Sequence, residues 1–168
     1  MKHSIIMAFI VILFAGCQTK KQGIMETQNN TQQITQLINK LYVYTDEQKW
    51  NKLHNEVFTE DVLLDMQSLG GPKQTMKATE ITKMWSEAYI GIDAVNHLAG
   101  NYLIDIDGNK AEVYAYATAT QYKKDATQGT TREFVGTYNF KVEKLEGKWR
   151  LYFFQYNLKY MTGNIEFE

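Results

Sequence analysis

The hydrophobic period changes once along this chain, and that change limits the folds open to it. Up to about residue 91, apolar side chains recur at helical spacing, as in Ile34, Leu37, Ile38 and Leu41. From residue 94 onward, apolar and polar residues alternate with a period of two, which is typical of strands. Because helices precede a run of strands, the order predicts an α+β domain.

Three helices are expected before residue 92. The first covers residues 31–47, the second is short and begins near Trp50, and the third carries Ile81 and Trp85 and ends at Gly91. A short strand over residues 62–66 separates the second helix from the third and runs into a Gly-Gly-Pro turn at residues 70–72. The helices therefore form one layer with a single short strand between them.

Four longer strands are expected over residues 94–106, 110–123, 132–145 and 148–160. The pairs Asp107-Gly108 and Glu146-Gly147 predict tight hairpins, because glycine supplies the positive φ that such turns need. A curved, mostly antiparallel sheet wrapped around three N-terminal helices gives a cone-shaped α+β barrel. The open end of such a cone is a pocket.

The last strand suggests a protein interface. The residues expected on one of its faces are Arg150, Tyr152, Phe154, Tyr156, Leu158 and Tyr160. This face holds more apolar area than one layer of helices covers. We therefore expect a homodimer that pairs through the sheet.

Composition excludes several functional classes. Eighteen Lys and Arg against 19 Asp and Glu give a net charge of −1, which leaves no cationic surplus for nucleic acid. The chain has one Cys, and His54 and His97 lie far apart without metal-ligand spacing, so no metal site is expected. Serine hydrolase, metalloprotease, phosphate-loop and dinucleotide motifs are all absent from the sequence, and no cofactor is expected.

The N-terminus has the pattern of an export signal. Lys2 precedes an apolar run over residues 4–14, which is too short to span a bilayer, and Ala15-Gly16-Cys17 follows. This pattern resembles a bacterial lipoprotein signal peptide, in which the cysteine receives the lipid. The resemblance implies that residues 1–16 are removed and that Cys17 is lipidated. Residues 17–30 are polar and without periodicity, so we expect a flexible tether there. We expect a cell-envelope protein anchored by lipid in the outer membrane, facing the periplasm or the surface; a plain secretory signal is the alternative.

Several short segments in order carry a resemblance to a known family. They are Trp50, Phe58-Thr-Glu-Asp61-Val-Leu-Leu-Asp65, His97, Ile106-Asp-Gly-Asn-Lys-Ala111 and Gly147-Lys-Trp149-Arg150. Together these segments resemble the SnoaL-like group of the nuclear transport factor 2 superfamily. The resemblance covers about residues 31–163, within one expected domain over residues 31–168, and implies the cone fold. Its relatives include isomerases, dehydratases and proteins without known activity.

The resemblance implies three catalytic candidates. Asp65 lies near the carboxylate base of isomerase-like relatives, although a shift of one residue would turn it out of the pocket. His97 matches a histidine that moves protons in dehydratase-like relatives, whose partner on the next strand is replaced here by residues 118–122. Tyr42 matches a phenol that donates to a developing oxyanion. His54 is expected to be structural.

Aromatic side chains supply the candidate ligand contacts, with one amide beside them. The ligand-binding candidates are Trp85, Tyr89, Asn101, Tyr116 and Tyr156. Three functions remain open. The first is binding of a small, largely apolar molecule in the cone. The second is cofactor-free isomerase or dehydratase (lyase) activity, and the third is a non-catalytic dimeric scaffold.

Overall fold

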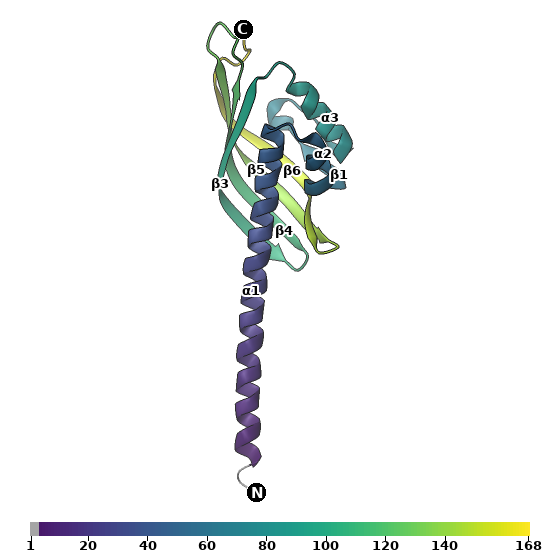
Figure 1. Cartoon of the computed structure of the whole chain (residues 1–168), viewed down its shortest axis with the longest axis vertical. Helices are drawn as coiled ribbons and strands as arrows, with labels where there is room; N and C mark the ends of the chain where they lie inside the picture. Colours follow the sequence, from purple (N-terminus) through teal and green to yellow (C-terminus); the bar gives the residue numbers. More distant parts are fainter. Residues whose placement is uncertain (1–3) are drawn as a thin grey trace. The chain divides into compact units, whose positions relative to one another are not determined.

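A computed structural model describes the backbone of residues 4–168 and the side chains of residues 23–168. The chain forms two units, residues 1–33 and residues 34–168, and helix α1 (Ser4–Asp46) contributes to both (Figure 1). The predicted signal peptide and the Cys17 side chain lie outside the described side chains, so both stay predictions. Within the described part of the chain, no helix has the length and apolar character needed to cross a membrane.

Helix α1 begins earlier than residue 31, where the apolar stripe predicted its start. Residues 17–30, predicted as an irregular tether, are helical. Their composition explains this, because apart from Gly23 the segment is rich in Gln, Lys, Glu and Met, which favour helices, and it has no proline. The hydroxyl of Thr27 donates to the carbonyl of Gly23 within the same helix, at 3.0 Å.

The helices of the second unit follow the predicted order. Residues 34–46 of α1 come first, then α2 (Trp50–Lys52), a π-helical turn η1 (Leu53–Val57) and α3 (Ala78–Ala88). A short 3₁₀ turn η2 (Gln67–Leu69) precedes the Gly-Gly-Pro turn. The predicted second helix is therefore split between an α-helical and a π-helical turn.

Six strands form one sheet, in the order β2-β1-β6-β5-β4-β3. The strands are β1 (Phe58–Asp65), β2 (Lys73–Lys77), β3 (Ala94–Asp107), β4 (Lys110–Tyr122), β5 (Thr131–Leu145) and β6 (Lys148–Gly163). Among the strands of residues 4–168, only β1 and β6 pair in parallel. The α+β class, the three helices and the mostly antiparallel sheet are confirmed, and strand β2 is an addition.

Both predicted hairpins are present. Asp107 pairs with Lys110, so Gly108 and Asn109 form the turn, and Gly108 has a φ of 58°. Leu145 pairs with Lys148, and both turn residues have positive φ. These two-residue turns fix the register of the β3–β4 and β5–β6 pairs.

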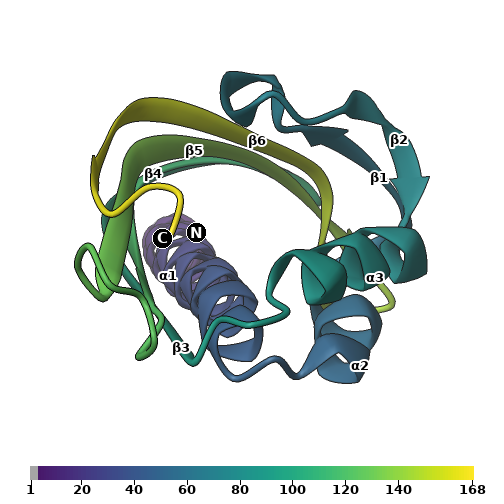
Figure 2. The same cartoon turned by 90° about the horizontal axis from the view of Figure 1, so that it is seen from above.

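The concave face of the sheet packs against the helices. Viewed from above, the sheet curves around residues 34–46 of α1, and α3 and α2 lie beside that segment (Figure 2). The inward residues of β4 are all buried and mostly small: Ala111, Val113, Ala115, Ala117 and Ala119. Short side chains at these positions leave room for residues 34–46 of α1, whose buried residues Ile34 and Ile38 are completely shielded from solvent.

The residues of the predicted interface stripe on strand β6 do not all lie on one face of the sheet. The register shifts between Lys141 and Val142 of β5, and again between Val135 and Gly136, so β6 carries two bulges. A bulge moves the residues that follow it to the other face of the sheet. Phe154 and Tyr156 are buried on the concave side, whereas Tyr160 is 57% exposed. The six residues therefore do not share one face, and the alternation does not support a dimer.

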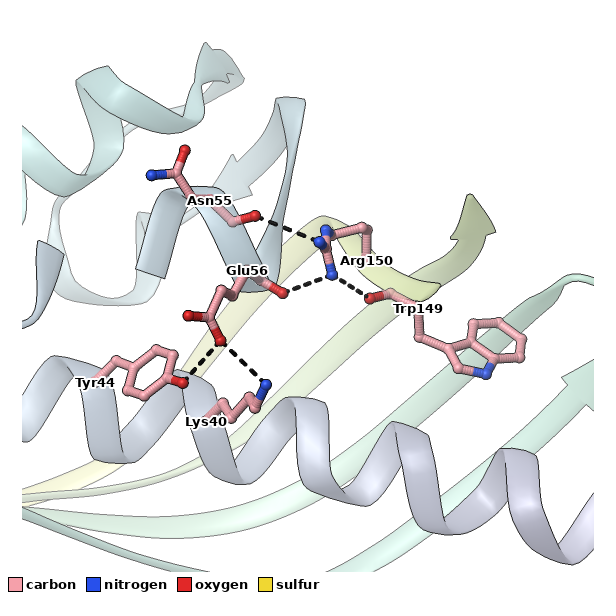
Figure 3. A network of polar contacts seen from close by, with 6 residues as sticks. All are labelled: Lys40, Tyr44, Asn55, Glu56, Trp149 and Arg150. Atoms are coloured by element: carbon pink, nitrogen blue, oxygen red, sulfur yellow. Dashed lines mark hydrogen bonds and ion pairs between the residues drawn. The ribbon is translucent and has the colours of Figure 1, made fainter. Parts of the chain in front are cut away.

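A polar network joins η1 to α1 and β6 (Figure 3). The guanidinium of Arg150 donates to the carbonyl oxygens of Glu56 (2.8 Å), Trp149 (3.2 Å) and Asn55 (3.4 Å). The carboxylate of Glu56 accepts from the Tyr44 hydroxyl at 2.9 Å and pairs with Lys40, and these contacts lower the pKa of Glu56 in that order of importance. Arg150 thus donates hydrogen bonds to the carbonyls of Asn55 and Glu56. These carbonyls lie at the end of the π-helical turn, which leaves them without a partner of its own.

Candidate functional site

A cavity of about 200 Å³ lies between the helices and the concave face of the sheet. Its wall is mainly apolar and aromatic, and is formed by Leu41, Tyr42, Thr45, Met66, Leu69, Trp85, Ala88, Tyr89, His97, Ala119, Gln121, Phe134, Tyr138, Phe154 and Tyr156. Leu69 and Ala88 are exposed, so the mouth opens between η2 and the end of α3. An apolar cavity of about 150 Å³ is large enough for benzene, so this one fits a ring-sized molecule.

His97 and Asp46 form a dyad at the wall of this cavity. The Nδ1 atom of His97 lies 2.5 Å from Oδ1 of Asp46, and the backbone N–H of His97 donates to Oδ2 at 2.9 Å. The two carboxylate oxygens therefore hold both the ring and the backbone of one residue. Both side chains are well shielded, with 9% exposure for His97 and 17% for Asp46.

The dyad fixes which nitrogen of His97 carries the proton. An ionised carboxylate only accepts hydrogen bonds, so in the neutral form of the ring Nδ1 donates to Asp46 and Nε2 carries the lone pair. Among the described side chains none hydrogen-bonds Nε2. Since His97 lines the cavity, this nitrogen is available as a base to a molecule bound there.

Tyr42 packs against one face of the His97 imidazole. Its ring stacks on that of His97 with a centroid distance of 5.2 Å and an angle of 29°. Tyr42 and Asp46 are four residues apart on α1, so they lie on the same face of the helix. One helical turn therefore supplies both the hydrogen-bond acceptor and the stacking surface for His97.

Four phenols gather around the cavity. Tyr138 contacts Tyr42 edge-on at 5.5 Å and Tyr156 at 4.8 Å, between ring centroids. Burial raises the pKa of Tyr42, with smaller contributions from neighbouring phenols, and burial raises the pKa of Tyr156 to about 12. Burial also raises the pKa of Tyr89 and of Tyr138. The hydroxyls are therefore neutral donors at any physiological pH.

Asp65 lies outside the cavity wall. Phe154 of β6 lines the cavity, so the next residue, Gln155, points to the opposite face of the sheet. Asp65 pairs with Gln155 and therefore points to that opposite face as well. Its carboxylate is bound by Lys73 at 3.0 Å and by Gln155 at 2.9 Å. Burial acts to raise the pKa of Asp65, but these hydrogen bonds outweigh it and lower the pKa. Asp65 is therefore turned out of the cavity by the one-residue shift, and it lies with Lys73 and Gln155 on the convex face of the sheet.

The other candidates divide in the same way. Trp85, Tyr89 and Tyr156 line the cavity together with Tyr42 and His97. Asn101 is exposed at the bulge of β3. Tyr116 faces away from the buried alanines of β4, and the ammonium of Lys159 lies over its ring at 4.3 Å. The structure does not bring Asn101 and Tyr116 to the cavity, and the binding roles of all five residues stay predictions.

His54 lies outside the cavity wall. Its Nδ1 is 3.4 Å from the Thr82 hydroxyl. Among residues 23–168, no group of three or more His, Cys, Asp and Glu side chains is placed to hold a metal ion.

Two residues of the site were missed from the sequence. Asp46 is the partner of His97, although the resemblance placed that partner on β4; the contact joins residues 51 positions apart, so no sequence pattern marks it. Gly136 is the second. An added Cβ there would lie 2.5 Å from Cε2 of the Tyr156 ring, so the ring has room at this position because Gly136 has no side chain. No sequence pattern marks this contact.

Residues 26–154 match the model of the SnoaL-like domain family. The chain belongs to this family. No curated protein matches the chain.

Solved structures show the same fold at low identity. The Kfla4162 protein of Kribbella flavida has 19% identity and a TM-score of 0.78, with 82% of this chain and 95% of that one covered. A protein of Novosphingobium aromaticivorans described as a scytalone dehydratase has 16% identity and a TM-score of 0.70, covering 81% and 88%. The LinA-type3 hexachlorocyclohexane dehydrochlorinase of Novosphingobium barchaimii has 12% identity and 0.70, covering 84% and 94%.

Proposed function

We propose that this SnoaL-like domain binds a small, largely apolar, ring-sized molecule and removes a proton from one of its carbon atoms. The observation that carries the proposal is the Asp46–His97 dyad on the wall of an apolar cavity. Binding alone needs no such dyad, whereas a general base needs an oriented imidazole with a free nitrogen. Asp46, a partner that no sequence pattern indicated, favours the enzyme over a simple binder or a scaffold.

The reaction class is an elimination or an isomerisation without a cofactor. In the elimination, Nε2 of His97 takes the proton, the C–H electron pair forms a new double bond, and the adjacent leaving group departs with its bonding pair. Asp46 stabilises the imidazolium that results. The names of two similar structures, a dehydratase and a dehydrochlorinase, denote eliminations of this kind.

A simple probe tests the base. In 5-nitrobenzisoxazole, removal of one C–H proton breaks the N–O bond and releases a coloured phenolate, and the molecule is small and planar. We expect His97→Gln to lower kcat/KM for this probe by about 10²-fold, because a positioned general base contributes about 10²–10⁴-fold. Absorbance of the phenolate measures the rate.

His54→Gln is the matched control, because it makes the same change at a histidine outside the cavity. It should leave the rate unchanged. Equal rates for wild type, His97→Gln and His54→Gln would mean that His97 is not a base, and the binding function would then be preferred.

We further propose that the protein is exported and anchored to the cell envelope through lipid on Cys17. The support is the lipoprotein-type signal that ends in Ala15-Gly16-Cys17. Cys17→Ser should move the full chain from the membrane fraction to the soluble fraction of the envelope. An unchanged distribution between the two fractions would exclude the anchor.

Homodimerisation stays a prediction. The described side chains on the convex face of the sheet include exposed Leu98, Leu103 and Tyr160. Sedimentation of residues 23–168 as a monomer at micromolar concentration would exclude it.

A further inference from the structure

Residues 164–168 turn inward from the end of β6 toward the concave side of the sheet, and we call this segment the strap (Figure 2). At Gly163, where β6 ends, φ is 86°, and an added Cβ would collide with the carbonyl oxygen of Thr131. The change of direction therefore needs a glycine.

The loop between β4 and β5 receives the strap through polar contacts. The backbone N–H groups of Thr127 and Gln128 donate to the backbone oxygen of Glu168, at 2.7 Å and 3.1 Å. The ammonium of Lys123 donates to the carbonyl oxygen of Phe167 at 3.1 Å. A segment held mainly by hydrogen bonds at the surface, with few buried apolar contacts, opens more readily than the core of a domain.

One aromatic ring anchors the strap. Phe167 is 5% exposed and is the one residue of the strap that is buried. Its φ of 55° is unfavourable for a bulky side chain, so the contacts of the docked strap must compensate for the strained backbone. Arg132 supplies two of these contacts. Its guanidinium carbon lies 4.5 Å from the centroid of the Phe167 ring, and its Nη1 donates to the carbonyl oxygen of Ile165 at 2.6 Å.

Arg132 also contacts the cavity wall. Its Nε donates to the side-chain oxygen of Gln121 at 2.9 Å, and its guanidinium carbon lies 5.3 Å from the centroid of the Phe134 ring. Gln121 and Phe134 both line the cavity. Because a guanidinium is planar and rigid, a change in its position on the side of the strap also changes its position on the side of the wall.

We infer that the strap and the cavity are linked: the docked strap holds Arg132 where it fixes Gln121 and Phe134, so a ring-sized apolar molecule binds more tightly when the strap is docked. The linkage is reciprocal, so the bound molecule must stabilise the docked strap by the same factor. Phe167 and Arg132 are then positioning residues, since both act through the side chains of the wall. This inference rests on the proposed function, since it takes the cavity as the ligand site.

Indole is a suitable probe, because it is planar, largely apolar, ring-sized and chemically inert under these conditions. Calorimetry on the full chain should show that Phe167→Ala weakens the binding of indole by about fivefold or more, since coupling between linked sites is typically 5–150-fold. The melting temperatures of wild type and variant verify that the domain stays folded.

Phe153→Ala is the matched control. It removes the same ring, which also lies under a cation, with the ammonium of Lys141 at 5.9 Å from the centroid. Phe153 pairs with the exposed Leu63 and does not line the cavity. Its replacement should leave the affinity for indole within about twofold, as expected for a change outside the linked elements.

Hydrogen exchange measures the reverse direction of the linkage. The amide hydrogens of Thr127 and Gln128 are bonded to the strap, so they exchange when the strap opens. Saturating indole should slow their exchange by the factor by which opening of the strap weakens indole binding.

A third readout needs no ligand. The side-chain amide signal of Gln121 in a nitrogen–proton spectrum should shift in Phe167→Ala and stay in place in Phe153→Ala. Equal affinities for indole in these two variants, exchange at Thr127 and Gln128 that indole does not slow, no detectable binding of indole, or an unmoved Gln121 signal would each overturn the inference.

The outcome is distinct from that of the proposed function. His97→Gln should lower turnover of 5-nitrobenzisoxazole and leave the linkage between indole and the strap intact. Linkage combined with turnover that does not depend on His97 would support this inference and reject the base. Turnover that depends on His97, without linkage, would do the reverse.

Discussion

Replacement of Asp46 by Asn should lower kcat/KM for 5-nitrobenzisoxazole by about 10²-fold or more. Asn has the same shape, but it loses the charge that stabilises the imidazolium, and its amide nitrogen donates rather than accepts. A donor next to Nδ1 favours the tautomer with the proton on Nε2, which removes the lone pair from the cavity. The measurement is the rate of phenolate release by wild type and variant at equal concentration.

Asp105→Asn is the control for the change in charge. Asp105 lies on the same strand as His97, is exposed and faces away from the cavity, since it pairs with the exposed Glu112. Its replacement should leave kcat/KM within about twofold, as surface charges contribute little. An effect of Asp46→Asn no larger than that of Asp105→Asn would mean that the dyad is structural, with no role in proton transfer.

Replacement of Gly136 by Ala has the largest expected effect on stability. The new Cβ would lie 2.5 Å from the ring of Tyr156 and 2.6 Å from the carbonyl oxygen of Asn157, and the backbone there is paired on both sides. Overpacking of this kind costs about 1–3 kcal/mol, and a carbonyl oxygen yields less readily than a flexible side chain. We expect a loss of roughly 3 kcal/mol in the free energy of unfolding, measured by urea denaturation.

Gly100→Ala is the matched control. It makes the same substitution in strand β3, at a glycine where an added Cβ meets no atom within 4 Å. It should be neutral or slightly stabilising, since alanine restricts the unfolded chain more than glycine does. A similar loss of stability at both positions would show that strand propensity, and not the contact with Tyr156, is responsible.

The strands were predictable because their signals are local. The period of two sets each strand, and the glycines in the two hairpin turns set where each pair begins. Strand β2 was missed because Lys73–Lys77 is polar and mostly exposed, so it carries no apolar alternation. The start of α1 was missed because a polar segment with good helix formers resembles an irregular tether when no apolar stripe marks it.

The site was predictable only in part. Tyr42, His97, Trp85, Tyr89 and Tyr156 could be chosen from residue type, position and resemblance, and the structure places all five on the cavity wall. The face of Asp65 depends on a register that one residue reverses.

The remaining parts of the site depend on tertiary contacts. The bulges of β6, which decide which aromatic residues turn inward, leave no mark on composition. The Asp46–His97 contact joins residues 51 positions apart, so local patterns say nothing about it.

The tautomer of His97 is the most direct test of the central claim, that Asp46 orients this imidazole as a base for the cavity. A long-range proton–nitrogen correlation spectrum of the ¹⁵N-labelled protein at neutral pH identifies which ring nitrogen carries the hydrogen. We predict that Nδ1 of His97 is protonated and Nε2 is not, and that Asp46→Asn changes this pattern. A proton on Nε2 in the wild type would contradict the claim.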